Sequence, residues 1–205
     1  MSVGMTRNLT YRIALVIALA SHGLGCAQLD EPTPPPPPAP VEIDETLISG
    51  WVSHYRDPAI FDQVSGTPYP SALSGTAFIQ VYVSRDSMTP FSVIAPELSG
   101  SEAVIPAGGI IVREVLDANK LPLRLTVMAK GPAGYNPHLR DWYFAVSDLQ
   151  GVPLLDKDGV PRSGRMTDCY GCHVPRAADD YLFGVPMDDR APAGSDANTT
   201  QPPPE

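Results

Sequence analysis

Residues 123–129, Leu-Arg-Leu-Thr-Val-Met-Ala, decide the fold because their apolar and polar side chains alternate with the period of a β-strand. Three similar runs rich in β-branched and aromatic residues accompany this one, AFIQVYV at 77–83, GIIVREV at 109–115 and WYFAV at 142–146. Clusters of Gly, Pro, Asn and Asp separate the runs, as turns separate strands. The short spacings predict an antiparallel sheet in a mainly β (α+β) domain.

A few short helices are expected to pack on this sheet, one near residues 51–55 and one before Cys169. All these segments fall within residues 43–187, which are numerous enough for one domain with its own core. Residues 188–205 are rich in Pro, Asp, Ala, Ser and Thr and show no apolar period. This composition predicts a disordered tail.

The first 25 residues have the features of an export signal. Arg7 and Arg12 precede an apolar run at 13–20, and small residues follow up to Gly25. The run is far shorter than the roughly 20 residues that span a bilayer. A buried N-terminal helix is the alternative, which these signal features disfavour. Residues 1–25 are therefore predicted to be a signal peptide.

Cys26 stands where this signal would end, in the sequence Gly-Leu-Gly-Cys at 23–26. The site resembles a bacterial lipobox, although Gly23 occupies the position where Leu is usual. An ordinary cleavage site is the alternative, but lipidation explains an otherwise odd thiol. Residues 26–42, with prolines at 34–38, are then a lipid-anchored, Pro-rich linker of extended geometry. The protein is expected in the bacterial cell envelope facing the periplasm, or else secreted to the periplasm.

The charge balance excludes one class of partner. The chain has 14 basic and 23 acidic side chains, and residues 1–25 contain two of the basic ones and no acid. The mature protein would carry 12 basic side chains and a formal charge of −11. An acidic protein without a basic stripe is a poor match for phosphate backbones, so nucleic acid is not an expected partner.

The sequence CYGCH at residues 169–173 is a haem attachment signature. Each thiol adds to a vinyl group of the porphyrin and forms a thioether, and the two-residue gap puts both sulfurs on one side of a helical turn. The adjacent His173 then reaches the iron as an axial ligand. One covalently bound haem c per chain is predicted, with Cys169 and Cys172 attaching it and His173 binding its iron.

Three other uses of this motif fit less well. A tetrahedral zinc site needs four ligands, and outside the signal peptide only His54 and His138 remain to complete one. A thioredoxin-like redox pair follows a strand in a βαβ unit, and the sequence predicts no such unit. A disulfide between Cys169 and Cys172 would close a small, strained loop.

Several further segments occur in an order typical of one known family. They are GIIVRE at 109–114, LTVMAK at 125–130, GYNP at 134–137, DW at 141–142 and DYLF at 180–183. With the CxxCH motif, they make the chain similar to the cytochrome P-460 family over roughly residues 50–184. The resemblance implies a mainly β, dimeric fold with a His-ligated haem c and an open distal side. Type members oxidise hydroxylamine or nitric oxide and carry a Lys–haem cross-link, whereas cytochromes c′-beta lack the cross-link and bind small gases.

Two positions depart from the family's pattern. Arg113 stands where many relatives have the Lys of Ile-Val-Lys-Glu, which is where the cross-linking Lys is expected. Arginine stays protonated, so Lys130 is the alternative donor for such a bond. Tyr143 stands where relatives often have the Glu of Asp-Trp-Glu, and tyrosine is a weaker base with an unperturbed pKa of about 10. Both changes count against hydroxylamine oxidation.

Other residues are candidates for the haem pocket. Arg113 has either a distal or propionate-binding role, or a place on the strand surface. Trp142 either lines the pocket or packs in the core. Tyr181 and Phe183 follow the motif closely enough to pack on the porphyrin. Weaker candidates for a sixth iron ligand are Met128, His54 and His138.

Three functions are consistent with these features. The preferred one is a haem protein that binds nitric oxide or carbon monoxide, or transfers electrons, at an open iron. The alternatives are an enzyme that oxidises hydroxylamine or nitric oxide, and a structural envelope lipoprotein with a peripheral haem. The expected partners are a small diatomic or nitrogenous ligand, an electron-transfer protein, the membrane through the lipid anchor, and a second copy of the chain in a homodimer.

Overall fold

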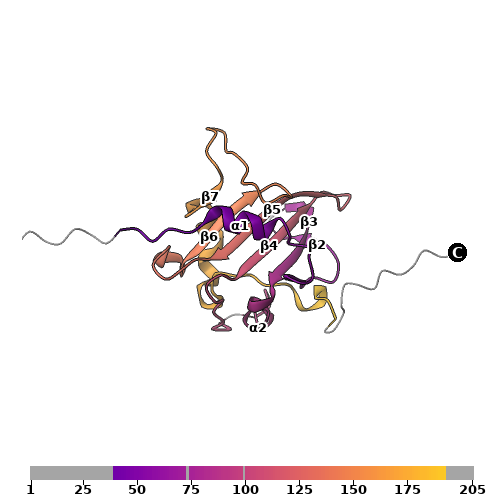
Figure 1. Cartoon of the computed structure of the whole chain (residues 1–205). Helices are drawn as coiled ribbons and strands as arrows, with labels where there is room; N and C mark the ends of the chain where they lie inside the picture. Colours follow the sequence, from indigo (N-terminus) through magenta and orange to yellow (C-terminus); the bar gives the residue numbers. More distant parts are fainter. Residues whose placement is uncertain (1–38, 73, 99, 193–205) are drawn as a thin grey trace, which may run out of the picture. The chain divides into compact units, whose positions relative to one another are not determined.

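The computed structural model describes residues 39–72, 74–98 and 100–192, without the side chains of residues 74–76. The predicted signal peptide, Cys26 and most of the Pro-rich linker lie outside the described residues, as does the tail from residue 193. In chain order the helices and strands are α1 (Glu45–Val52), β1 (Phe61–Gln63), β2 (Tyr69–Ser71), β3 (Ser74–Ser84), α2 (Met88–Ser92), β4 (Ile110–Leu116), β5 (Pro122–Lys130), β6 (Trp142–Ser147), β7 (Ser163–Gly164) and α3 (Thr167–His173) (Figure 1).

One antiparallel sheet carries the domain. Its strand order is β1-β3-β4-β5-β6-β7, and β2 also pairs with β3. Its centre is formed by β3 to β6, which correspond to the four strands expected from the sequence. The prediction of an antiparallel sheet with a few short helices is therefore confirmed.

The first helix begins earlier than the sequence suggested. The helix expected near residues 51–55 is α1, which ends at Val52. It begins after Asp44, whose carboxylate accepts a hydrogen bond of 3.0 Å from the Leu47 backbone N–H. This is N-cap geometry, and it fixes the start of the helix. The second expected helix is α3, and it contains the CxxCH motif itself.

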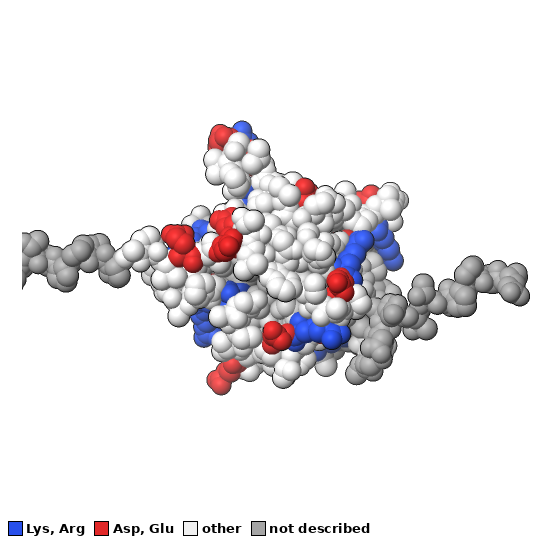
Figure 2. Space-filling model, in the orientation of Figure 1, with Lys and Arg blue, Asp and Glu red and all other residues white. Residues whose placement is uncertain are grey.

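Side chains alternate between the two faces of the sheet, and each face has its own core. On the α1 face, Ile48 and Val52 pack with residues such as Val112 and Val127. On the opposite face, which we call the motif face, Ile111 and other strand residues pack with α2 and the C-terminal segment. Figure 1 shows α1 crossing in front of the strands. Figure 2 shows the surface in the same orientation, where charged side chains are scattered around a largely uncharged middle.

The α1 face contains a buried charged residue. The Glu114 side chain is fully buried and accepts hydrogen bonds from the Tyr55 hydroxyl at 2.7 Å and the Tyr82 hydroxyl at 3.5 Å. It also pairs with the half-exposed guanidinium of Arg56. Burial and the neighbouring Glu114 raise the pKa of Tyr82 to about 12, so this hydroxyl stays protonated and able to donate.

The domain continues past residue 187, where the sequence predicted its end. Arg190 donates to the backbone carbonyls of Ser92 and Val185, which lie far apart in the chain. The Asp189 carbonyl accepts from the Gly66 N–H at 2.8 Å. Residues 188–191 have the polar composition of a tail, but hydrogen bonds to backbone groups elsewhere in the domain fix them, and composition does not reveal such bonds.

In the described part of the chain, no helix is long and apolar enough to cross a membrane.

Candidate functional site

The three motif residues lie together on α3. Cys169 is half-buried and packs against the core of the motif face, whereas Cys172 is exposed. Both thiols are free, so the strained disulfide considered from the sequence is not formed in this structure. The two cysteines lie three residues apart on α3, the spacing expected for attachment to two vinyl groups.

The protonation of Cys169 distinguishes this site from a thiol redox centre. Burial, assisted by the neighbouring Asp168 carboxylate, raises the pKa of Cys169 to about 11. Cysteines that act as redox nucleophiles or metal-binding thiolates have lowered pKa values and lie in electropositive surroundings. Cys169 therefore remains a thiol at neutral pH, which argues against a thioredoxin-like role.

His173 is oriented by a single strong hydrogen bond. Its Nδ1 lies 2.6 Å from the backbone carbonyl oxygen of Tyr181. A carbonyl only accepts, so Nδ1 carries the proton and Nε2 keeps a free lone pair. Burial lowers the pKa of His173, although the bond to Tyr181 opposes this effect. A neutral imidazole with Nδ1–H bonded to a carbonyl is the usual arrangement of a metal-binding histidine.

Aromatic rings surround this imidazole. Phe144 and Phe183 meet it edge to face, with ring centroids 5.7 and 5.2 Å from that of His173. The Phe183 side chain is 40% exposed, and half-buried Tyr181 donates from its hydroxyl to the His138 carbonyl at 3.2 Å. The structure thus brings the Tyr181 backbone carbonyl and the Phe183 ring to His173, and packing of either side chain on a porphyrin stays a prediction.

Arg113 lies on the motif face and has an incomplete set of hydrogen bonds. One Nη donates to the Ser71 hydroxyl at 2.7 Å, but the buried Nε has no hydrogen-bond partner among the described residues. An unsatisfied buried donor is costly, and an acidic ligand is one group that would satisfy it. Its charge also helps to lower the pKa of His173. A carboxylate such as a haem propionate would satisfy this donor, and the residues present therefore fit a haem.

Trp142 and Lys130 occupy the core beside this site. Trp142 is fully buried, and its indole N–H donates to the Asp180 carbonyl at 2.8 Å. The Lys130 amine lies 4.6 Å from the centre of the Trp142 ring and bonds both carboxylate oxygens of Asp180 at 2.7 Å. Of the two roles considered for Trp142, its burial corresponds to core packing. Sequence reasoning missed Asp180, which stood out only as part of the DYLF segment.

Two candidates face away from the motif. Tyr143 alternates with its strand neighbours onto the α1 face, where its hydroxyl donates to Glu45 at 3.2 Å and burial raises its pKa. His54 follows α1, on that same side of the sheet, with its Nδ1 3.0 Å from the Gly50 carbonyl. Neither residue is placed to act at a metal bound by His173. Met128 is buried in the core of the motif face, where it pairs with Phe144 in the sheet register.

The chain was compared with known protein families and with curated proteins. No family model and no curated protein matches it. The similarity to the cytochrome P-460 family thus remains a prediction from short segments. In the described ranges, no group of three or more His, Cys, Asp or Glu side chains could hold a metal ion by itself. A haem iron needs only one such ligand, because the porphyrin supplies four nitrogens.

Proposed function

We propose that the protein is an exported c-type haem protein that binds small gases, nitric oxide or carbon monoxide, or transfers electrons. Cys169 and Cys172 would attach the haem, and His173 would bind its iron. The observation that carries this proposal is the arrangement on α3, where two free thiols accompany an imidazole whose Nδ1 is already bonded to the Tyr181 carbonyl. Once bound, the haem supplies an iron that can take a small ligand or an electron.

The placement of two of the three potential sixth ligands, His54 and Met128, supports an open iron. His54 lies on the other side of the sheet, and Met128 is only 8% exposed and packs in the core. In the proposal, Arg113 binds a propionate or orients a ligand through its unpaired Nε. Phe144 and Phe183 exclude water from the imidazole through their edge-to-face contacts.

Gas binding is favoured over oxidation of hydroxylamine because Arg113 and Tyr143 are unsuited to accept a proton. Such an oxidation needs a general base with a pKa near the working pH. Arg113 stays protonated, and Tyr143 lies on the α1 face with a raised pKa. The two residues at the positions that depart from the family's pattern are therefore unsuited to accept a proton at the iron.

The ferrous protein is expected to show a conventional c-type absorption spectrum that changes on addition of carbon monoxide or nitric oxide. Turnover of hydroxylamine with an artificial electron acceptor should be slow, because neither Arg113 nor Tyr143 is suited to accept a proton. Spectra of the oxidised, reduced and gas-treated protein, with an acceptor assay, test this. A strongly red-shifted ferrous band with rapid turnover would favour the oxidase instead. An unchanged spectrum with both gases would overturn gas binding.

Membrane attachment through Cys26, which lies outside the described residues, is part of the same proposal. Cys26→Ser is expected to move the mature protein from the membrane fraction to the soluble envelope fraction, because serine cannot accept the thioether-linked lipid. Cell fractionation followed by immunoblotting measures this, with the Cys172→Ser protein as a control that should stay in the membrane fraction. Identical fractionation of the Cys26→Ser and wild-type proteins would contradict lipidation.

A further inference from the structure

We infer that the buried Lys130–Asp180 ion pair is a positioning device for His173. It acts through the turn formed by Asp180 and Tyr181, because the carbonyl of Tyr181 accepts the Nδ1 proton of His173. This inference rests on the proposed function, in which His173 is the iron ligand. It assigns to Lys130, at the end of strand β5, a role in fixing the orientation of the His173 imidazole.

The turn has a backbone conformation that needs external support. Asp180 and Tyr181 both have positive φ angles, 53° and 64°, although neither is glycine. Side chains disfavour this left-handed region, and consecutive residues remain there only when their surroundings hold them. One local support is the Tyr181 N–H, which donates to the Arg176 carbonyl at 2.8 Å. The carbonyl that orients His173 thus belongs to a strained segment.

Long-range bonds that converge on Asp180 provide the remaining support. Lys130, the last residue of β5, bonds both of its carboxylate oxygens at 2.7 Å. The backbone N–H of Ile105 donates to the same carboxylate at 2.8 Å, and the Trp142 indole donates to the Asp180 carbonyl at 2.8 Å. The Asp180 side chain is fully buried, so water does not compete for these bonds. Two strands and a loop therefore fix the residue immediately before Tyr181.

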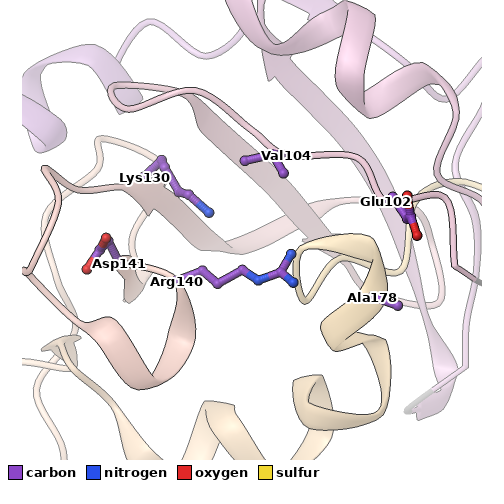
Figure 3. Close-up of a pocket in the computed structure, with 6 residues that line it drawn as sticks. All are labelled: Glu102, Val104, Lys130, Arg140, Asp141 and Ala178. Atoms are coloured by element: carbon purple, nitrogen blue, oxygen red, sulfur yellow. The ribbon is translucent and has the colours of Figure 1, made fainter.

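The amine of Lys130 faces Asp180 and a solvent cleft. Figure 3 shows Lys130 and Arg140 extending into this cleft, which has a volume of about 640 Å³. Its lining consists of Glu102, Val104, Lys130, Arg140, Asp141 and Ala178, and includes no residue of α3. This placement suits a structural partner of Asp180 better than a covalent bond to a haem held by α3.

The support of the Tyr181 carbonyl by Asp180 affects the basicity of the His173 imidazole. A hydrogen bond from Nδ1–H to a fixed acceptor raises the basicity of a ligating histidine and sets the ring's orientation. If Asp180 loosens, the Tyr181 carbonyl loses its fixed direction and the bond to Nδ1 weakens. A less basic ligand stabilises ferric iron less, so the reduction potential rises.

The chain offers a matched control for this effect. Asp179, the neighbour of Asp180, is also buried, but its carboxylate bonds the Ser101 N–H at 2.8 Å and Arg176 at 2.9 Å. Asp179 thus supports the same segment through Ser101 and Arg176, whereas Asp180 is the residue that bonds Lys130 and Trp142. Asp179→Asn weakens the bond to the Arg176 guanidinium but keeps every bond to Asp180 and the bond from the Tyr181 N–H to the Arg176 backbone carbonyl, so the positioning chain stays in place.

The test uses the full-length, haem-loaded protein, with haem content measured first by the pyridine haemochrome method. A wild-type protein without covalent haem would overturn the proposed function before any variant is compared. In haem-loaded samples, resonance Raman spectroscopy of the ferrous state reports the iron–histidine stretch, and a redox titration gives the midpoint potential. Asp180→Asn is expected to lower and broaden this stretch and to raise the potential, whereas Asp179→Asn leaves both unchanged.

Trp142→Phe is the second variant, in case Asp180→Asn does not fold. It removes the indole N–H bond to the Asp180 carbonyl, together with part of the buried ring that Lys130 contacts, and is expected to shift both measurements in the same direction by a smaller amount. Wild-type values in Asp180→Asn, or in Trp142→Phe when it alone folds, would overturn the inference and leave the proposed function intact. An equal shift in Asp179→Asn would also overturn it, because the effect would then be a general loss of packing.

Discussion

Replacing both Cys169 and Cys172 with serine is expected to abolish the proposed covalent attachment of haem. A serine hydroxyl does not form the thioether that joins a cysteine to a porphyrin vinyl group, and His173 alone would leave the cofactor exchangeable. Denaturing electrophoresis with haem staining should show a band for the wild-type protein and none for the double variant. Stain that survives the double change would refute the assignment.

Single variants and a distant cysteine are the controls for this result. Cys169→Ser and Cys172→Ser each leave one thiol, so each should retain a weaker band. Cys26→Ser should stain like the wild type, because that residue lies outside the attachment motif. The double variant should keep a folded β signature in circular dichroism, since Cys172 is exposed and Cys169 is only partly buried against the core of the motif face. A double variant that fails to fold would make the single variants the deciding samples.

The second large effect is expected from Arg56→Ala, on the side of the sheet away from the motif. Arg56 is the cation paired with Glu114, whose side chain is fully buried. Removing the cation leaves a buried carboxylate with only tyrosine hydroxyls as donors. Breaking a fully buried ion pair from one side costs about 3 to 5 kcal/mol and an exposed pair contributes about 1 kcal/mol or less, so the half-exposed Arg56 places this case at roughly 2 kcal/mol. Urea unfolding followed by circular dichroism measures the loss.

A double-mutant cycle separates the charge effect from simple loss of packing. Glu114→Gln keeps an oxygen that accepts from Tyr55 but removes the buried charge. In that background, Arg56→Ala should cost about 1 kcal/mol or less, since no unpaired charge remains. Equal costs in the two backgrounds would mean that Arg56 stabilises the domain by packing rather than by neutralising Glu114.

The sheet could be predicted because its central strands are long and their side chains follow the strand period. The strands that the sequence missed are short, such as Phe61–Gln63 and Ser163–Gly164, and Pro70 in β2 is a residue that usually argues against a strand. Such segments pair because the long β3 and β6 offer them an edge, which is a tertiary effect. The sequence did contain a signal for the early start of α1, because Asp44 is a favourable N-cap residue.

Only the part of the candidate site that lies in one short stretch of sequence could be predicted. CxxCH identified Cys169, Cys172 and His173, but the acceptor for His173 is a backbone carbonyl, which no side-chain pattern encodes. The bond between Lys130 and Asp180 joins residues fifty positions apart, so it required the fold. Strand alternation alone would have placed Tyr143 on the face opposite its two neighbours in β6, and that signal was present in the sequence.

The separation of the two cores has a consequence for how this protein can change over evolutionary time. Arg113 and Glu114 are adjacent in the chain, yet they belong to different faces and bond to different partners. Substitutions of side chains that share no partners and are separated by the sheet are expected to affect stability nearly additively. Mutations that retune the chemistry of one face can therefore accumulate while the opposite face maintains the margin against unfolding. The sheet thus separates substitutions that change the chemistry of one face from substitutions that change the stability of the other.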